Sequence, residues 1–265
     1  MPVPDVAVWL DTYRHDLKRS LTAAARDGFR ALQASSAVPG LTPAELSGSG
    51  RRHLRRYLEQ LGLRCAGLSA DFPGAGLADP QWAEQRLARL GELAELARGL
   101  GVDTVAAPLT GLAAPATAGL ARELLAAAAD VADRHGVRLC VQPAVHELAE
   151  AATALRGLGA PHAGLRLDTA APLTTPQALD AAGALVRDVH LLDYRRAGSG
   201  LEEVAIGRGE VDFARLIAAL GQVDAPPALV VRQNAAGLGV DALRRGREYI
   251  ETLLGGAPRL RERER

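Results

Sequence analysis

Apolar residues along the chain fall into two alternating kinds of segment. Short runs rich in β-branched and aliphatic residues predict strands, at Val6–Leu10, Ala31–Ser35, Arg64–Ser69, Thr104–Ala107, Arg138–Gln142, Gly164–Asp168, Arg187–Leu192 and Ala228–Gln233. Longer segments with apolar residues at i, i+3, i+4 and i+7 predict helices, at Arg14–Asp27, Ser49–Leu61, Asp79–Leu100, Ala116–His135, Val145–Leu158, Thr175–Ala184, Asp212–Leu220 and Asp241–Leu254.

The residues that lie between these segments support the same assignment of strands and helices. Glycine follows most predicted helices, where a left-handed residue ends a helix; these are Gly28, Gly62, Gly101, Gly136, Gly159 and Gly221. In GRGEVDF at 207–213, Asp212 is expected to cap the next helix and Phe213 to enter the core.

A regular strand–helix alternation of this length predicts an α/β (β/α)8 TIM barrel. A doubly wound sheet is the competitor, but a dinucleotide-binding version carries a glycine-rich turn after the first strand. The corresponding turn here, LDTYRHDL, has no glycine. We therefore predict one barrel domain over residues 1–258. The charged tail over 259–265 is expected to be frayed.

Charge, hydropathy and cysteine content limit the classes of function that the chain can have. Lys plus Arg and Asp plus Glu each total 31 in 265 residues, so no bulk charge indicates nucleic acid or a membrane surface. No apolar run reaches the roughly 20 residues of a membrane span, and the first residues do not resemble a signal peptide. Cys65 and Cys140 are expected to be buried thiols in a reducing compartment. These features favour a cytoplasmic protein.

Polar side chains follow several predicted strands at their carboxyl ends, where barrels and open parallel sheets place their chemistry. Residues 164–196 read as a βαβ unit that directs Asp168 and His190 the same way. The candidate site residues at these strand ends are Trp9, Gln142, Asp168, His190, Asp193, Arg196, Arg232 and Asn234.

Four motifs carry a resemblance to a known family. They are LRLDT at 165–169, DVHLLDYR at 188–195, GRGEVDF at 207–213 and LVVRQN at 229–234. In these motifs the chain resembles the xylose-isomerase-like TIM-barrel family of sugar isomerases, epimerases, inosose dehydratases and related AP endonucleases. An AP-endonuclease role is not expected, because such enzymes need several metals and a basic binding face.

The resemblance implies a divalent metal held at four strand ends by Glu, Asp, His and Glu. Asp168 and His190 match two of these positions, whereas the two Glu positions fall on Gln142 and Arg232. Arg196 falls where several epimerases place a substrate-binding arginine. The resemblance thus implies the pocket but not the complete ligand set.

The substituted positions predict a metal-free site. A guanidinium has only donors and stays protonated, so Arg232 cannot be a ligand. We expect Arg232 to replace the ion and to neutralise Asp168 with a bidentate fork. The alternative is one divalent ion such as Mn or Zn, held by Gln142, Asp168 and His190. A shift of one residue would exchange Arg232 for Gln233 at the mouth.

These residues suggest an isomerase or lyase that acts on a polyhydroxylated or keto small molecule without a metal cofactor, by isomerisation, dehydration or cyclisation. Asp168, His190 and Arg232 are the predicted catalytic residues. The other candidates named above are predicted to bind the substrate. Two alternatives stay open: a conventional metal-dependent sugar isomerase or epimerase, and a catalytically lapsed binding or partner protein in which these side chains are structural. A homodimer is compatible with the sequence, whereas nucleic-acid and membrane partners are not expected.

Overall fold

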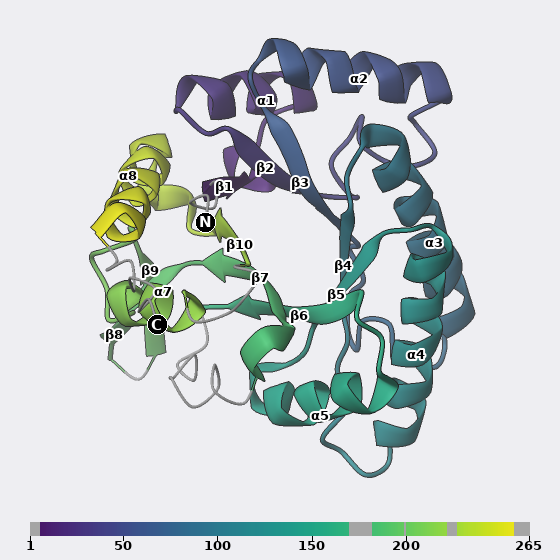
Figure 1. Ribbon diagram of the computed structural model, residues 1–265. Coiled ribbons are helices and arrows are strands. Elements are labelled where there is room, and N and C mark those ends of the chain that lie inside the picture. The colour runs from purple at the N-terminus through teal and green to yellow at the C-terminus, as the bar shows by residue number, and fades with distance from the viewer. Residues whose placement is uncertain (1–5, 170–181, 199, 222–226, 257–265) are drawn as a thin grey trace, which may run out of the picture.

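The computed structural model describes residues 6–169, 182–198, 200–221 and 227–256. Eight parallel strands close into a barrel in the order β1-β10-β7-β6-β5-β4-β3-β2, and the described helices lie around its outside (Figure 1). The strands are β1 Val6–Trp9, β2 Ala31–Ser35, β3 Arg64–Ser69, β4 Thr104–Pro108, β5 Arg138–Gln142, β6 Ala163–Asp168, β7 Val186–Leu191 and β10 Ala228–Val231. The predicted (β/α)8 barrel is confirmed.

Helices occupy most of the segments with helical periodicity. They are α1 Leu17–Arg26, α2 Gly48–Gln60, α3 Ala83–Leu100, α4 Ala118–Arg134, α5 Leu148–Leu158, α7 Phe213–Leu220 and α8 Val240–Gly256, with short 3-10 helices at Leu10–Tyr13, Val145–Glu147, Gly183–Leu185 and Ala236–Leu238. As predicted, Asp212 caps α7 by accepting a hydrogen bond from the Arg215 amide at 2.9 Å, and Phe213 is buried. The predicted helix Thr175–Ala184 lies largely outside the described residues.

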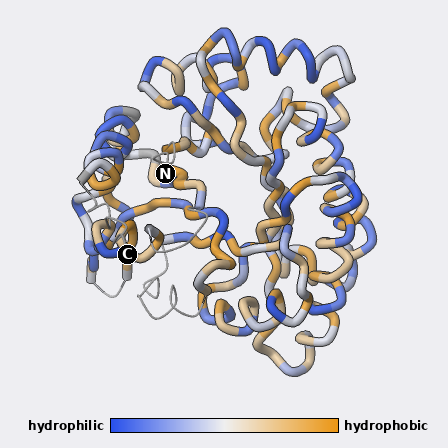
Figure 2. Tube along the Cα trace, viewed as in Figure 1, coloured by the Kyte–Doolittle hydropathy of each residue, from blue (hydrophilic) through white to orange (hydrophobic). Residues whose placement is uncertain are grey.

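Apolar side chains form two separate clusters. The large one fills the layer between strands and helices, while the outer face of the surface helix α2 is hydrophilic (Figure 2). The small cluster lies inside the barrel and contains Ala7, Trp9, Ala31 and Val230. Because most of these side chains are small, the barrel interior has room for polar groups.

Register between β6 and β7 decides which polar groups meet inside. The pairing shifts between Leu165 and Arg166, so Arg166 lies opposite Asp188 and Asp168 lies opposite His190. Gly164 permits this irregularity, because a Cβ atom there would lie 2.6 Å from the carbonyl oxygen of Leu185.

Two features differ from the sequence predictions. The residues after β7, where neither a strand nor a helix was predicted, form an antiparallel hairpin of β8 Asp193–Ala197 and β9 Gly200–Val204. Gly221 has φ −67° rather than the predicted left-handed conformation, which the other five predicted glycines do adopt. The α7 C-terminus therefore ends in a right-handed turn.

No helix in the described part of the chain is both long enough and apolar enough to span a bilayer. Both cysteines are free thiols, with Cys140 buried and Cys65 partly buried.

Candidate functional site

An arginine–aspartate pair lies at the mouth of the barrel, where the strands have their carboxyl ends. Asp168 ends β6 and Arg232 follows β10, and Nη1 of Arg232 lies 3.8 Å from Oδ2 of Asp168. The side chain of Arg232 is 26% exposed and that of Asp168 is 20% exposed. Arg232 therefore faces Asp168 across the mouth, whereas the Gln233 side chain donates to the carbonyl oxygens of Ala235 and Gly239.

Two neighbours hold the guanidinium of Arg232. Its Nε donates to Oδ1 of Asn234 at 3.0 Å, and its Cζ lies 5.5 Å from the centre of the Trp9 ring. The structure thus brings together four predicted site residues: Trp9, Asp168, Arg232 and Asn234. The expected bidentate fork is not formed, because 3.8 Å is an ion-pair distance rather than a hydrogen bond.

A second arginine–aspartate pair lies deeper, inside the barrel. Arg166 donates through Nε to Oδ2 of Asp188 at 2.6 Å, through Nη1 to Oγ of Ser69 at 2.8 Å and through Nη2 to Oε1 of Gln33 at 2.9 Å. Nε2 of Gln33 donates to Oδ1 of Asp188 at 3.1 Å. All four residues are buried, so these bonds compensate the loss of water around two charges. We call Gln33, Ser69, Arg166 and Asp188 the interior network.

His190 contacts the interior network rather than the open mouth. It is 1% exposed, its Nε2 lies 3.1 Å from Oε1 of Gln33, and its ring centre lies 5.1 Å from that of Trp9. Burial, and then the charges of Arg166 and Arg232, lower the pKa of His190 well below its usual value, so the imidazole is uncharged at neutral pH. Within the described part of the chain, its Nδ1 atom has no hydrogen-bond partner.

Asp193 is structural in this fold, contrary to the prediction that it binds substrate. It is fully buried, and its carboxylate accepts hydrogen bonds at 2.8–3.2 Å from the backbone amides of Tyr194, Gly207, Arg208, Gly209 and Val211. A Cβ atom at Gly209 would lie 2.2 Å from Oδ1 of Asp193, which explains the glycine. The carboxylate organises this loop and has no surface left for a ligand.

The structure also places two other predicted substrate-binding residues. Arg196 is on the β8–β9 hairpin with its side chain 84% exposed, and its Nε lies 3.6 Å from Oε2 of Glu210. No pattern along the chain predicts this hairpin, which carries Arg196 into solvent. Gln142 ends β5 and is partly exposed.

A further carboxyl group, Asp11, lies near the mouth. It follows β1, and its Oδ1 accepts a hydrogen bond from the Ser35 amide at 3.2 Å. Burial raises the pKa of Asp11, while the charge of Arg232 lowers it and that of Asp71 raises it. Asp11 was not among the predicted site residues, although its position directly after a strand is the signal that identified the others.

Tyr194 on β8 is also near the pair. Burial, followed by the negative charges of Glu203 and Asp168, raises the pKa of Tyr194 to about 12. Its phenol is therefore protonated at neutral pH and can donate a hydrogen bond. Predicting this neighbour would have required knowledge of the hairpin.

The residues at the mouth do not fit the divalent ion that the family resemblance implies. In the ranges that the structure describes, no three His, Cys, Asp or Glu side chains are grouped so that they could hold a metal ion. Oxygen-coordinated divalent ions need carboxylates, and the position of one carboxylate is taken by the guanidinium of Arg232 beside Asp168.

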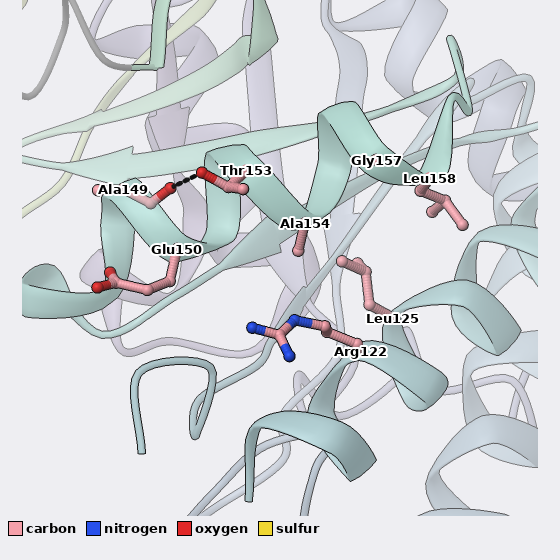
Figure 3. Close-up of a pocket in the computed structure, with 8 residues that line it drawn as sticks. All are labelled: Arg122, Leu125, Ala149, Glu150, Thr153, Ala154, Gly157 and Leu158. Carbon is pink, nitrogen blue, oxygen red and sulfur yellow. Dashed lines mark hydrogen bonds between the residues drawn. The ribbon is translucent and has the colours of Figure 1, made fainter. Parts of the chain in front are cut away.

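A surface groove of about 630 Å³ lies elsewhere, between helices α4 and α5 (Figure 3). Its lining residues are Arg122, Leu125, Ala149, Glu150, Thr153, Ala154, Gly157 and Leu158. It includes none of the strand-end residues, so we do not treat it as the catalytic site.

Comparison with known families agrees with this architecture. The family model described as xylose isomerase-like TIM barrel matches residues 21–253. A comparison with curated protein sequences gave no match.

Solved structures with similar folds include enzymes. The structure of L-ribulose 3-epimerase is 19% identical, with a TM-score of 0.77, covering 96% of this chain and 95% of that chain. A xylose isomerase-like TIM-barrel protein from Mycobacterium smegmatis, in complex with magnesium, is 18% identical, with a TM-score of 0.77 and coverage of 96% and 97%. The probable 3-DHS dehydratase from Bacillus anthracis is 12% identical, with a TM-score of 0.72 and coverage of 93% and 98%. At these identities the likeness shows the fold alone.

Proposed function

Because this chain belongs to the xylose isomerase-like TIM-barrel family, we propose that it isomerises, dehydrates or cyclises a polyhydroxylated or keto small molecule without a divalent metal. The presence of an epimerase and a probable dehydratase among its structural neighbours supports an enzymatic role. The observation that carries the proposal is the Arg232–Asp168 pair at the barrel mouth.

This pair has the chemistry that enolisation needs. The Asp168 carboxylate accepts a proton from the carbon next to a substrate carbonyl, and the electrons of the broken C–H bond form a C=C bond. The carbonyl oxygen thereby becomes an enolate oxygen, which the guanidinium of Arg232 stabilises by hydrogen bonding and charge. Return of the proton gives an isomer or epimer, whereas loss of a hydroxyl group as water gives a dehydrated product.

The geometry of Arg232 suits this role. Asn234 and Trp9 fix the guanidinium, while its distance of 3.8 Å from Asp168 leaves Nη groups able to turn towards a substrate oxygen. Arginine stays charged throughout the pH range of an enzyme. It therefore supplies the positive charge that the family's ion would otherwise provide.

Asp11 is the candidate for the second proton-transfer group. Its raised pKa increases the fraction of protonated carboxyl at any given pH, which favours proton donation over proton removal. Asp168 as base and Asp11 as acid would replace the two glutamates expected from the family resemblance.

Deuterium exchange tests the proposal without requiring the natural substrate to be known. Protein treated with EDTA and desalted is incubated in D2O with a panel of keto compounds that includes L-ribulose and 3-DHS, and deuterium next to the carbonyl is measured by NMR. We expect exchange that added Mn, Zn or Mg does not increase. Asp168→Asn and Arg232→Met are expected to abolish it.

Arg196→Met is the matched control, since it removes an exposed arginine that does not contact the mouth pair. It is expected to exchange at the wild-type rate. Exchange that appears only after a metal is restored would overturn the proposal in favour of a metal-dependent isomerase. Saturable binding of a panel compound without exchange would instead identify a lapsed binding protein.

A further inference from the structure

Hydrogen bonding in the interior network fixes the orientation of the Gln33 side chain from both ends. Nη2 of Arg166 can only donate, so the Gln33 atom 2.9 Å away is the carbonyl oxygen Oε1. Asp188 accepts from Arg166 at 2.6 Å as a carboxylate and can only accept, so the Gln33 atom 3.1 Å from it is the amide Nε2. A flipped amide would place donor against donor and acceptor against acceptor.

The orientation of Gln33 in turn fixes the tautomer of His190. Oε1 of Gln33 has only lone pairs, so Nε2 of His190, 3.1 Å away, must carry the ring proton. In the uncharged imidazole the other nitrogen, Nδ1, then has a lone pair. Nδ1 is buried and lacks a hydrogen-bond partner in the described ranges of the chain. Burying an acceptor without a donor costs free energy, and a ligand that supplies a donor recovers it.

We propose that Gln33, Arg166 and Asp188 are positioning residues that keep the proton of His190 on Nε2, so that Nδ1 accepts a hydrogen bond from a hydroxyl group of the bound substrate. This inference rests on the proposed function, because a polyhydroxylated compound supplies such donors. His190 is 1% exposed and its ring centre lies 5.1 Å from that of Trp9, so the inference requires a neighbouring side chain to move when the substrate binds.

The tautomer is measured directly in the intact 15N-labelled protein. Two-bond 1H–15N spectra distinguish a pyrrole-like from a pyridine-like ring nitrogen, and His190→Gln identifies the His190 signals among the six histidines. We expect a pyrrole-like Nε2 and a pyridine-like Nδ1 in the wild type. A proton on Nδ1 in the wild type would overturn the inference without any variant.

Variants of the network separate positioning from general stability. Gln33→Met removes the acceptor of the His190 proton and is expected to give mixed tautomers. Gln33→Glu combined with Asp188→Asn keeps an acceptor for Nε2 and a donor–acceptor pair between positions 33 and 188, so it is expected to preserve the wild-type pattern. Ser69→Ala is the matched control, because it removes a different hydrogen bond of Arg166, at 2.8 Å, and does not involve His190. It is also expected to leave the tautomer unchanged, and a mixed tautomer there would contradict the assigned role of Gln33.

Ligand addition tests the role of Nδ1 separately from turnover. Titration with the keto-sugar panel, beginning with L-ribulose, is expected to move the Nδ1 resonance as it accepts a hydrogen bond. If no compound moves it, the inference is wrong, whether or not deuterium exchange occurs. For a compound that is turned over, Gln33→Met should lower kcat/KM by about tenfold or more, while Ser69→Ala stays near wild type. Unchanged turnover in Gln33→Met would make the network purely structural and leave the proposed function intact.

Discussion

The barrel contains two arginine–aspartate pairs, and β6 contributes one member to each. Arg166 and Asp188 lie inside the barrel at 2.6 Å, with side chains 2% and 0% exposed. Asp168, two residues further along β6, lies 3.8 Å from Arg232 at the mouth, where both side chains are partly exposed. The same two residue types therefore occur in two different environments.

The two pairs differ in their burial and in the hydrogen bonds of their guanidinium groups. Every nitrogen of the Arg166 guanidinium donates to a protein acceptor, as a buried charge requires. Among the described residues, Arg232 donates one hydrogen bond, through Nε to Asn234, and its Nη1 lies 3.8 Å from Asp168 at a partly exposed mouth. A guanidinium whose nitrogens all donate inside the barrel stabilises the fold in one arrangement, whereas a guanidinium at a partly exposed mouth is accessible to a ligand.

The largest expected effect is on the interior pair. Arg166→Met leaves Asp188 as an unpaired charge in the barrel, and we expect a loss of about 3–5 kcal/mol in the free energy of unfolding. Urea denaturation followed by circular dichroism measures this loss. A loss below about 1 kcal/mol would mean that water enters the barrel and solvates Asp188.

A double variant checks the cause of that loss. Arg166→Met combined with Asp188→Asn removes both charges and keeps an acceptor for Gln33. Because the residues interact directly, their effects should not add, and the double variant should be more stable than Arg166→Met alone. Additive losses would attribute the effect to packing instead of charge.

The next largest effect is the contribution of His190 to the free energy of unfolding, which depends on pH. Its pKa is lowered in the folded protein, so the unfolded chain binds a proton below about pH 6.5 that the folded chain does not bind. The stability that His190 contributes is thus present above this pH and is lost as the pH falls, by up to about 1.4 kcal/mol per pH unit. His190→Gln should remove this part of the pH dependence in urea denaturation series. Parallel curves for wild type and variant would show that the imidazole is solvated in the folded state.

The alternation of apolar residues was sufficient to predict the barrel and, within a few residues, its strands. It failed at the β8–β9 hairpin, because Asp193–Ala197 is polar and mostly exposed and has no apolar alternation. Tertiary contacts define this hairpin instead: the Asp193 carboxylate binds the loop that follows it. Arg196 was misplaced for the same reason.

At the site, the strand-end rule identified Asp168, Arg232, Asn234 and Trp9, which the structure brings together. The interior network was not predicted. Charged residues such as Arg166 and Asp188 are unusual in strands buried on both faces. Their presence in the sequence was the only indication of a buried ion pair. Their pairing depends on the register shift at Leu165/Arg166, which no local pattern encodes.

The smallest stability effect is expected at the mouth. Arg232→Met removes a partly exposed ion pair and a contact with Trp9, and we expect a loss of about 1 kcal/mol or less, although the same variant should abolish deuterium exchange. The loss should shrink further in 1 M salt, where the Debye length is about 3 Å, while the loss for Arg166→Met should persist. Arg196→Met, at a more exposed arginine, serves as the control in the same urea series. A loss as large as that of Arg166→Met would mean that the mouth pair stabilises the barrel as the interior pair does, and the contrast between a structural pair and a functional pair would no longer hold.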